Sequence, residues 1–138
     1  MNTLDINVLV RYLVRYIPEQ AEAARELIEE LTADDPGFIR CEVVLEVAWV
    51  LERTYRFTRI QVADAMMDLT ASDSLVVENS DDVAAAAYRY RRGGVGFSDL
   101  MILKATDRAN AAPLHTFDQR LARMQGTALV DTTGRTDA

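Results

Sequence analysis

The chain alternates short apolar segments with longer segments of helical periodicity. The short segments are predicted strands and cover residues 3–5, 38–39, 75–78, 113–116 and 128–130. Between them, apolar residues recur every three or four positions, as in an amphipathic helix. Strands that alternate with helices favour an α/β domain. The sequence therefore predicts an α/β fold with a central, mostly parallel sheet of about five strands.

Local signals set the expected helix boundaries. The predicted helices cover residues 8–13, 18–32, 42–53, 58–69, 81–92 and 97–109, with a short helix after Asp118. Thr58 and Gln61 have the spacing of a capping box, which marks a helix start. Trp49 and Met66 fall within predicted helices, and we expect both in the core.

Length and charge limit the class of protein. A chain of 138 residues fits one domain, which we expect over residues 1–131 with a polar tail at 132–138. The formal charge of −7 argues against a broad basic face that coats nucleic acid. It leaves room for an enzyme that holds nucleic acid through a metal ion. Lys104 is the single lysine, so a mechanism that needs several lysines is excluded.

Cysteine and histidine are too scarce for a disulfide or a zinc site. Cys41 is the one cysteine and His115 the one histidine. The first residues carry charges and lack the pattern of a secretory signal. No apolar stretch approaches the length of a membrane span. We therefore expect a cytoplasmic protein with no membrane partner.

Acidic residues follow several of the predicted strands. Asp5, Asp99 and Asp118 lie at or just beyond strand ends or loops at one edge of the sheet, where α/β proteins bind ligands. Glu42 and Glu46 lie on one face of the next helix. Such a carboxylate cluster suits Mg²⁺ or Mn²⁺. Taken singly, each Asp is better explained as a helix cap or a surface charge, and the spacing does not choose between the two glutamates.

Four segments in this order resemble the PIN-domain ribonucleases, and among them the VapC toxins of bacterial toxin–antitoxin pairs. They are LDINVLVRYL (residues 4–13), EVAWVLER (46–53), GFSDLMILKA (96–105) and HTFDQRLARM (115–124). The resemblance implies a three-layer α/β/α fold and an acidic quartet that carries catalysis. By position, the quartet is Asp5, Glu46, Asp99 and Asp118, and the metal ligands are the three aspartates.

The resemblance also assigns supporting residues. Asn7 matches a residue that orients the first Asp, and Thr116 matches a hydroxyl that assists the metal shell. Two positions depart from the family pattern: Ile6 stands where a hydroxyl residue is common, and Gly96 where many members carry a further Asp. These departures predict a site with fewer oxygen groups and weaker affinity for a second metal ion.

Five arginines are candidates for RNA contacts: Arg11, Arg15, Arg89, Arg91 and Arg92. Basic residues interleaved with tyrosines are able to grip and stack single-stranded RNA. The competing explanation is structural, since arginine is favoured at helix C-termini.

The resemblance implies a Mg²⁺-dependent endoribonuclease that cleaves single-stranded or structured RNA as the toxin of a toxin–antitoxin pair. It also implies a homodimer and a cognate antitoxin. Two alternatives remain: a non-toxin nuclease of RNA maturation or DNA processing, and a catalytically silent interaction module that kept the acids as caps.

Overall fold

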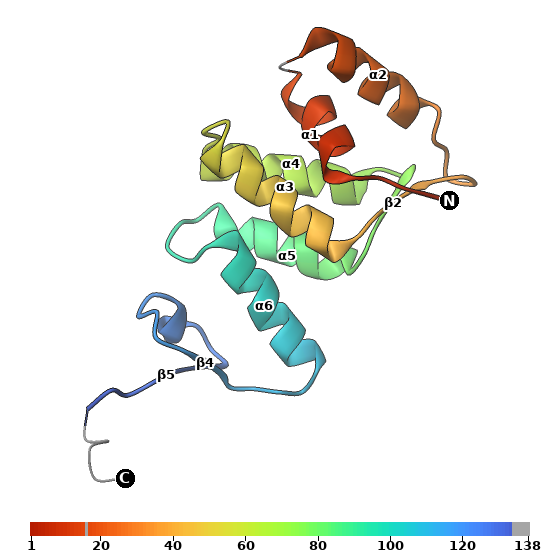
Figure 1. Ribbon diagram of the computed structural model, residues 1–138. Helices are drawn as coiled ribbons and strands as arrows, with labels where there is room; N and C mark the ends of the chain where they lie inside the picture. The colour runs from red at the N-terminus through yellow and green to blue at the C-terminus, as the bar shows by residue number, and fades with distance from the viewer. Residues whose placement is uncertain (16, 134–138) are drawn as a thin grey trace.

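The computed structural model describes residues 1–15 and 17–133, so residues 134–138 of the expected tail lie outside it. Within these residues, every strand and helix predicted from the periodicity is present (Figure 1). In chain order they are β1 (Asn2–Thr3), α1 (Ile6–Val14), α2 (Pro18–Glu29), β2 (Gly37–Ile39), α3 (Cys41–Arg53), α4 (Arg59–Ala71), β3 (Leu75–Val77), α5 (Ser80–Tyr90), α6 (Phe97–Arg108), β4 (Leu114–Thr116), the 3₁₀ helix η1 (Leu121–Arg123) and β5 (Thr127–Leu129). The α/β class is confirmed.

The strands form two parallel sheets where the sequence predicted one. The first has the order β1–β2–β3, and the second pairs β4 with β5. In the described residues β1 pairs with β2 alone, and β4 pairs with β5 alone. Gly126, just before β5, packs instead on the Leu103 side chain of α6. The two-stranded sheet therefore lies with α6 at one end of the molecule, away from α1 and α2 (Figure 1).

Short-range chemistry explains where several helices begin. The Thr58 hydroxyl accepts the Gln61 N–H, and the Gln61 side chain accepts the Thr58 N–H, which confirms the predicted capping box of α4. Pro18 occupies the first turn of α2, where its missing N–H has no cost. The break between α5 and α6 uses Gly93 and Gly94 at φ angles of 93° and 88°, a conformation that residues with a Cβ rarely adopt.

The core lies between the helices and one face of the three-stranded sheet. Leu9, Ile39, Leu51 and Met66 are fully buried in it, and they come from α1, β2, α3 and α4. Burial of one such side chain contributes about 1.5–3 kcal/mol to folding. The expectation for Trp49 is wrong, because this side chain is 56% exposed on the outer face of α3.

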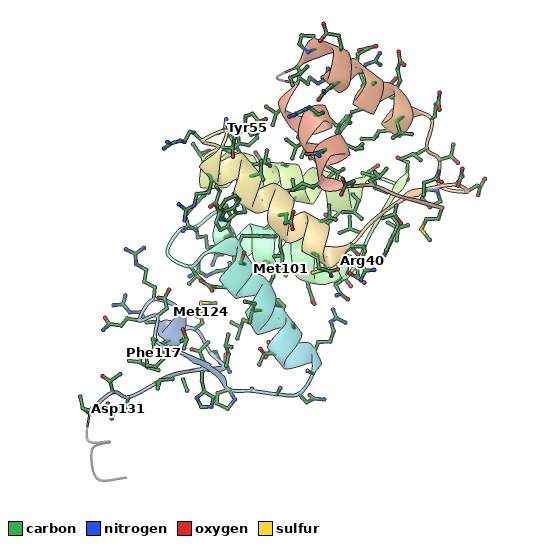
Figure 2. The ribbon with its side chains drawn as sticks, in the orientation of Figure 1. Arg40, Tyr55, Met101, Phe117, Met124 and Asp131 are labelled. Atoms are coloured by element: carbon green, nitrogen blue, oxygen red, sulfur yellow. The ribbon has the colours of Figure 1, made fainter. Side chains whose placement is uncertain are left out.

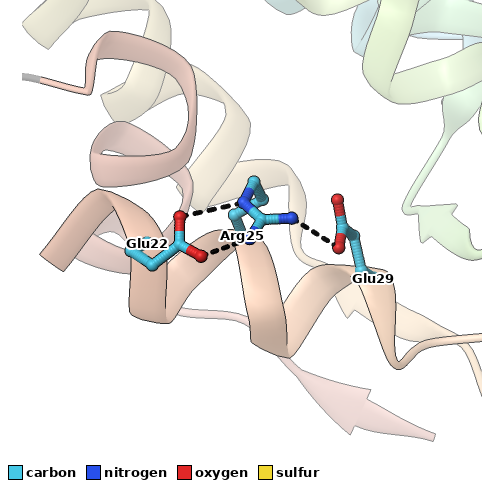
Figure 3. Close-up of polar contacts among 3 residues, drawn as sticks. All are labelled: Glu22, Arg25 and Glu29. Atoms are coloured by element: carbon cyan, nitrogen blue, oxygen red, sulfur yellow. Dashed lines mark hydrogen bonds and ion pairs between the residues drawn. The ribbon is translucent and has the colours of Figure 1, made fainter. Parts of the chain in front are cut away.

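The outer face of α2 is polar and stabilised by local ion pairs. Arg25 donates hydrogen bonds to Glu22 and, at 2.7 Å, to Glu29 (Figure 3). The hydrogen bond from Arg25 lowers the pKa of Glu22. This face is therefore a solvated helix surface. None of the helices in the described residues combines the length and apolar character needed to cross a membrane.

Candidate functional site

Asp5 connects the first strand to the first helix. It follows the buried Leu4 and takes the N-cap position of α1 with extended backbone angles, yet its side chain makes no capping hydrogen bond. The Asp5 side chain is exposed. The carboxylate is therefore open to solvent at the carboxyl end of β1, as the sequence predicted.

Asn7 lies in the first turn of α1 and lines a cavity of about 290 Å³ between α1 and α2. Among the described residues, Asn7 has no hydrogen bond to Asp5. Arg11 lines the same cavity and donates to the hydroxyl of Tyr55 at 3.2 Å. The geometry thus places Asn7 and Arg11 at the junction of α1 with α2.

Two glutamates of α3 have different surroundings. Glu46 is exposed, although the neighbouring Val47 is fully buried. Glu52 is half-buried, accepts a hydrogen bond from the Tyr90 hydroxyl, and lines a cavity of about 110 Å³ with Asp99. Burial and the contact with Glu52 raise the pKa of Tyr90 well above its ordinary value. Glu52 is therefore the α3 glutamate that lines the same cavity as Asp99, and the sequence did not single it out.

Asp99 occupies the first turn of α6, just after Gly96. A Cβ at Gly96 would lie 3.5 Å from the Asp99 carboxylate, so the glycine leaves one side of the carboxylate open. Burial raises the pKa of Asp99, and the negative charge of Asp118 raises it further. These two carboxylates therefore repel each other electrostatically. Protonation or a bound cation relieves such repulsion.

Asp118 is held in place by the backbone that follows it. Its Oδ1 atom accepts the N–H groups of Arg120 at 2.8 Å and Leu121 at 3.1 Å. The Thr116 hydroxyl accepts the Asp118 N–H at 3.0 Å, so Thr116 orients the segment that carries the acid. No hydrogen bond within the described residues uses Asp118 Oδ2. The capping role considered for this acid is therefore present and leaves one oxygen open.

The described residues, which include all four predicted acids, contain no group of three or more acidic, histidine or cysteine side chains placed to hold a metal ion. The convergence expected from the sequence is thus limited in this conformation to the coupling of Asp99 with Asp118. Carboxylate and hydroxyl oxygens are donors that Mg²⁺ and Mn²⁺ prefer. The donor chemistry fits such a cation, whereas the arrangement supplies too few ligands for a complete site.

Three of the candidate arginines have structural partners or lie apart from the acids. Arg91 pairs with Asp64 at 3.6 Å, and Arg92 stacks over the ring of the exposed Tyr88. Arg15 is exposed and ends α1 with a positive φ angle. The structural explanation therefore accounts for Arg91 and Arg92.

Arg89 differs from these arginines. It lines a cavity with Arg120 and Arg123, two residues that the sequence analysis did not single out. Arg120 and Arg123 follow the predicted ligand Asp118 closely in the sequence, and this proximity could have marked them as candidates for RNA contacts.

The PIN domain family model matches residues 3–126, which is most of the chain, and the protein belongs to the PIN domain family. PIN domains have a three-layer α/β/α fold and are generally nucleases that use divalent metals. Membership of this family favours a nuclease over other α/β proteins with acidic residues at strand ends. No curated protein shows a significant match to the chain.

Proposed function

We propose that the protein is a Mg²⁺-dependent endoribonuclease, with Mn²⁺ as a substitute cation. The observation that carries this proposal is the match of residues 3–126 to the PIN domain family, together with Asp99 in the first turn of α6 and Asp118 just after β4. Two carboxylates that repel each other at neutral pH attract a divalent cation. Asp5 is the third proposed ligand, because it is open to solvent at the carboxyl end of β1.

The residues of the chain have separate tasks in this proposal. Thr116 and the N–H groups after Asp118 hold that carboxylate in position. The carboxylate of the half-buried Asp99 lies next to Gly96, which has no side chain to cover it. A bound divalent cation supplies charge neutralisation and an acidified water for phosphodiester hydrolysis. A glutamate of α3 would be the residue that accepts a proton from such a water.

Loss of Asp118 tests the proposal. In Asp118→Asn, we expect cleavage of total cellular RNA in Mg²⁺ to fall about a hundredfold or more, because a charged ligand is lost. The matched control is Asp73→Asn, an exposed acid in the turn before β3, which should cleave like the unmodified protein. Equal cleavage by the Asp118→Asn and control variants would refute the proposal.

Glu46 and Glu52 make different predictions about the proton acceptor. The family resemblance assigns Glu46, while the geometry brings Glu52 to the cavity of Asp99. Loss of cleavage in Glu46→Gln alone would support the resemblance and require α3 to present another face to the substrate. Loss in Glu52→Gln alone would assign the role to the residue that the structure brings to Asp99.

The toxin role is part of the same proposal. The VapC-like motifs support a cytoplasmic toxin that works as a homodimer and is inhibited by a cognate antitoxin. Expression of the protein should arrest growth, and Asp118→Asn should abolish the arrest. Growth without arrest, together with RNA cleavage in vitro, would favour the nuclease of RNA maturation or DNA processing.

One observation favours a second candidate, the catalytically silent interaction module. The described residues contain no assembled group of three metal-binding side chains. A cation that binds only the folded state raises its stability. A rise in melting temperature at millimolar Mg²⁺, lost in Asp118→Asn, would support the nuclease. An unchanged melting temperature would support the silent module.

A further inference from the structure

The cavity that Arg89 lines lies between the glycine loop and η1. It has a volume of about 260 Å³ and is lined by Arg89, Gly94, Val95, Arg120, Arg123 and Met124. It therefore gathers three arginines from two segments that are about thirty residues apart in the sequence. Figure 2 places Met124 near Phe117, at the η1 end of the molecule.

Arg89 lines this cavity and makes hydrogen bonds with two neighbouring residues. Arg89 donates one hydrogen bond to the carbonyl of Gly93 at 2.9 Å and another to the sulfur of Met124 at 3.8 Å. Both partners are uncharged. The contacts orient the guanidinium of Arg89 without neutralising it.

The other two arginines of the cavity, Arg120 and Arg123, are exposed to solvent. Arg120 precedes η1 and Arg123 ends it, and both side chains are exposed. Within the described residues, no ion pair involves Arg89, Arg120 or Arg123, although Arg25, Arg40, Arg91 and Arg108 each pair with an acid. In a chain of net charge −7, three unpaired arginines around one cavity form a local site for an anion.

The cavity is open on the side of the glycine loop, and the segment that carries two of its arginines also contacts Asp118. A Cβ built on Gly94 meets no atom within 4 Å, so this wall leaves room for a ligand. The backbone N–H of Arg120 donates to Asp118 Oδ1 at 2.8 Å, which ties the arginine segment to the acid.

We propose that Arg89, Arg120 and Arg123 bind a backbone phosphate of single-stranded RNA at the segment that follows Asp118. Planar guanidinium groups match phosphate oxygens in a bidentate geometry, and three of them around one cavity fix the position of the strand. This inference rests on the proposed nuclease function and adds the site that holds its substrate. The phosphate contact carries no base preference, so it positions RNA of any sequence.

Binding without cleavage tests the proposal directly. The probe is a fluorescein-labelled single-stranded RNA of twelve mixed nucleotides, titrated with protein in excess chelator and followed by anisotropy. The variant is Arg120→Ala/Arg123→Ala, because both side chains are exposed and their loss should leave the fold intact. We expect the Kd to rise about tenfold or more. The slope of log Kd against log salt should fall by about 0.7, the value for the loss of one phosphate contact.

The matched control removes two charges elsewhere. In Arg25→Ala/Arg108→Ala, both arginines are engaged with acids on α2 and at the end of α6, so RNA binding should stay within about twofold of the unmodified protein. Equal weakening in both double variants would reduce the effect to net charge and overturn the proposal. Absence of binding by the unmodified protein, or unchanged binding by Arg120→Ala/Arg123→Ala, would overturn it as well.

The two proposals fail separately. RNA binding through the cavity with no cleavage in Mg²⁺ would contradict the nuclease and leave the phosphate site in place. Cleavage in Mg²⁺ with normal binding by Arg120→Ala/Arg123→Ala would contradict the phosphate site and leave the nuclease in place.

Discussion

Strands β3 and β5 each contain three residues and each pair with one parallel neighbour, yet their side chains are buried to different extents. Leu75 and Val77 of β3 are 8% and 6% exposed, whereas Leu129 of β5 is 50% exposed. Phe117, which follows β4, is 68% exposed. The three-stranded sheet thus belongs to the core, and the two-stranded sheet is attached to it by one side.

The two sheets differ in how much of each is covered by helices. Parallel strands are stable when both faces are covered, and a two-stranded sheet has little stability alone. Helices α4 and α5 pack together in the region that contains β3, while η1 contributes the buried Leu121 next to β4 and β5. Hydrogen bonds between strands are similar in both sheets. The extent to which helices pack on the strands therefore explains the difference in burial.

The largest expected effect contrasts leucines from the two regions. Leu51→Ala removes a fully buried side chain of α3 and should lower the free energy of unfolding by about 3–5 kcal/mol. Leu129→Ala removes a half-exposed side chain of β5 and should cost about 1 kcal/mol or less. Urea unfolding followed by circular dichroism measures both. Equal losses would mean that the two-stranded sheet is as well packed as the core.

A second contrast concerns polar contacts. Tyr90→Phe removes the hydroxyl that donates to the half-buried Glu52 and should cost about 1–2 kcal/mol, because a carboxylate loses its partner. Arg108→Ala removes an ion pair between Arg108 of α6 and Asp82 of α5. Because Arg108 is exposed, the loss should lower the free energy of unfolding by about 0.5 kcal/mol. The same unfolding curves compare them. A larger cost for Arg108→Ala would reverse the order.

Cation binding should reduce the difference between the regions. Asp5 lies in the three-stranded region, and Asp118 lies beside the two-stranded sheet. A cation held by both should slow hydrogen exchange in peptides that contain β4 and β5, with little change in β2 and β3. Mass spectrometry with and without Mg²⁺ measures this. Asp118→Asn should remove the effect, and unchanged exchange in the unmodified protein would show that the cation does not link the regions.

The smallest effect is a dependence of stability on pH. The folded state raises the pKa of Asp99 above its ordinary value of 3.8, so the charged form lowers stability above the raised pKa. In chelator, Asp99→Asn should therefore melt at a higher temperature than the unmodified protein at pH 7. The difference should shrink as the pH falls toward 3.8, where Asp99 becomes protonated. A constant difference across this range would argue against the charge as its cause.

Much of the fold was predictable because its signals are local. The Thr58–Gln61 pair predicted the start of α4, and the glycines after α5 predicted its end. Apolar periodicity predicted the helices between the strands. Such features depend on neighbours a few residues apart, so a single sequence carries them.

The candidate site was predictable only in part. Asp99 and Asp118 were both singled out, and the charge of Asp118 raises the pKa of Asp99, but the described residues do not bring the four predicted acids together as one metal-binding group. Glu52 was missed because it lies six positions after Glu46, or about 120° around a helix of 3.6 residues per turn. Which of these faces meets α6 depends on packing between helices distant in sequence.

By itself, the sequence determined the order of strands and helices, the oxygen-only set of candidate ligands and the membership of the PIN domain family. The tertiary structure decided that the strands form two sheets and that Glu52 lines the same cavity as Asp99. It also decided that Arg89 meets Arg120 and Arg123 around one cavity. The physical reason is the range of the interactions: periodicity and caps act over a few residues, whereas strand pairing and cavities join segments that only the packed chain brings together.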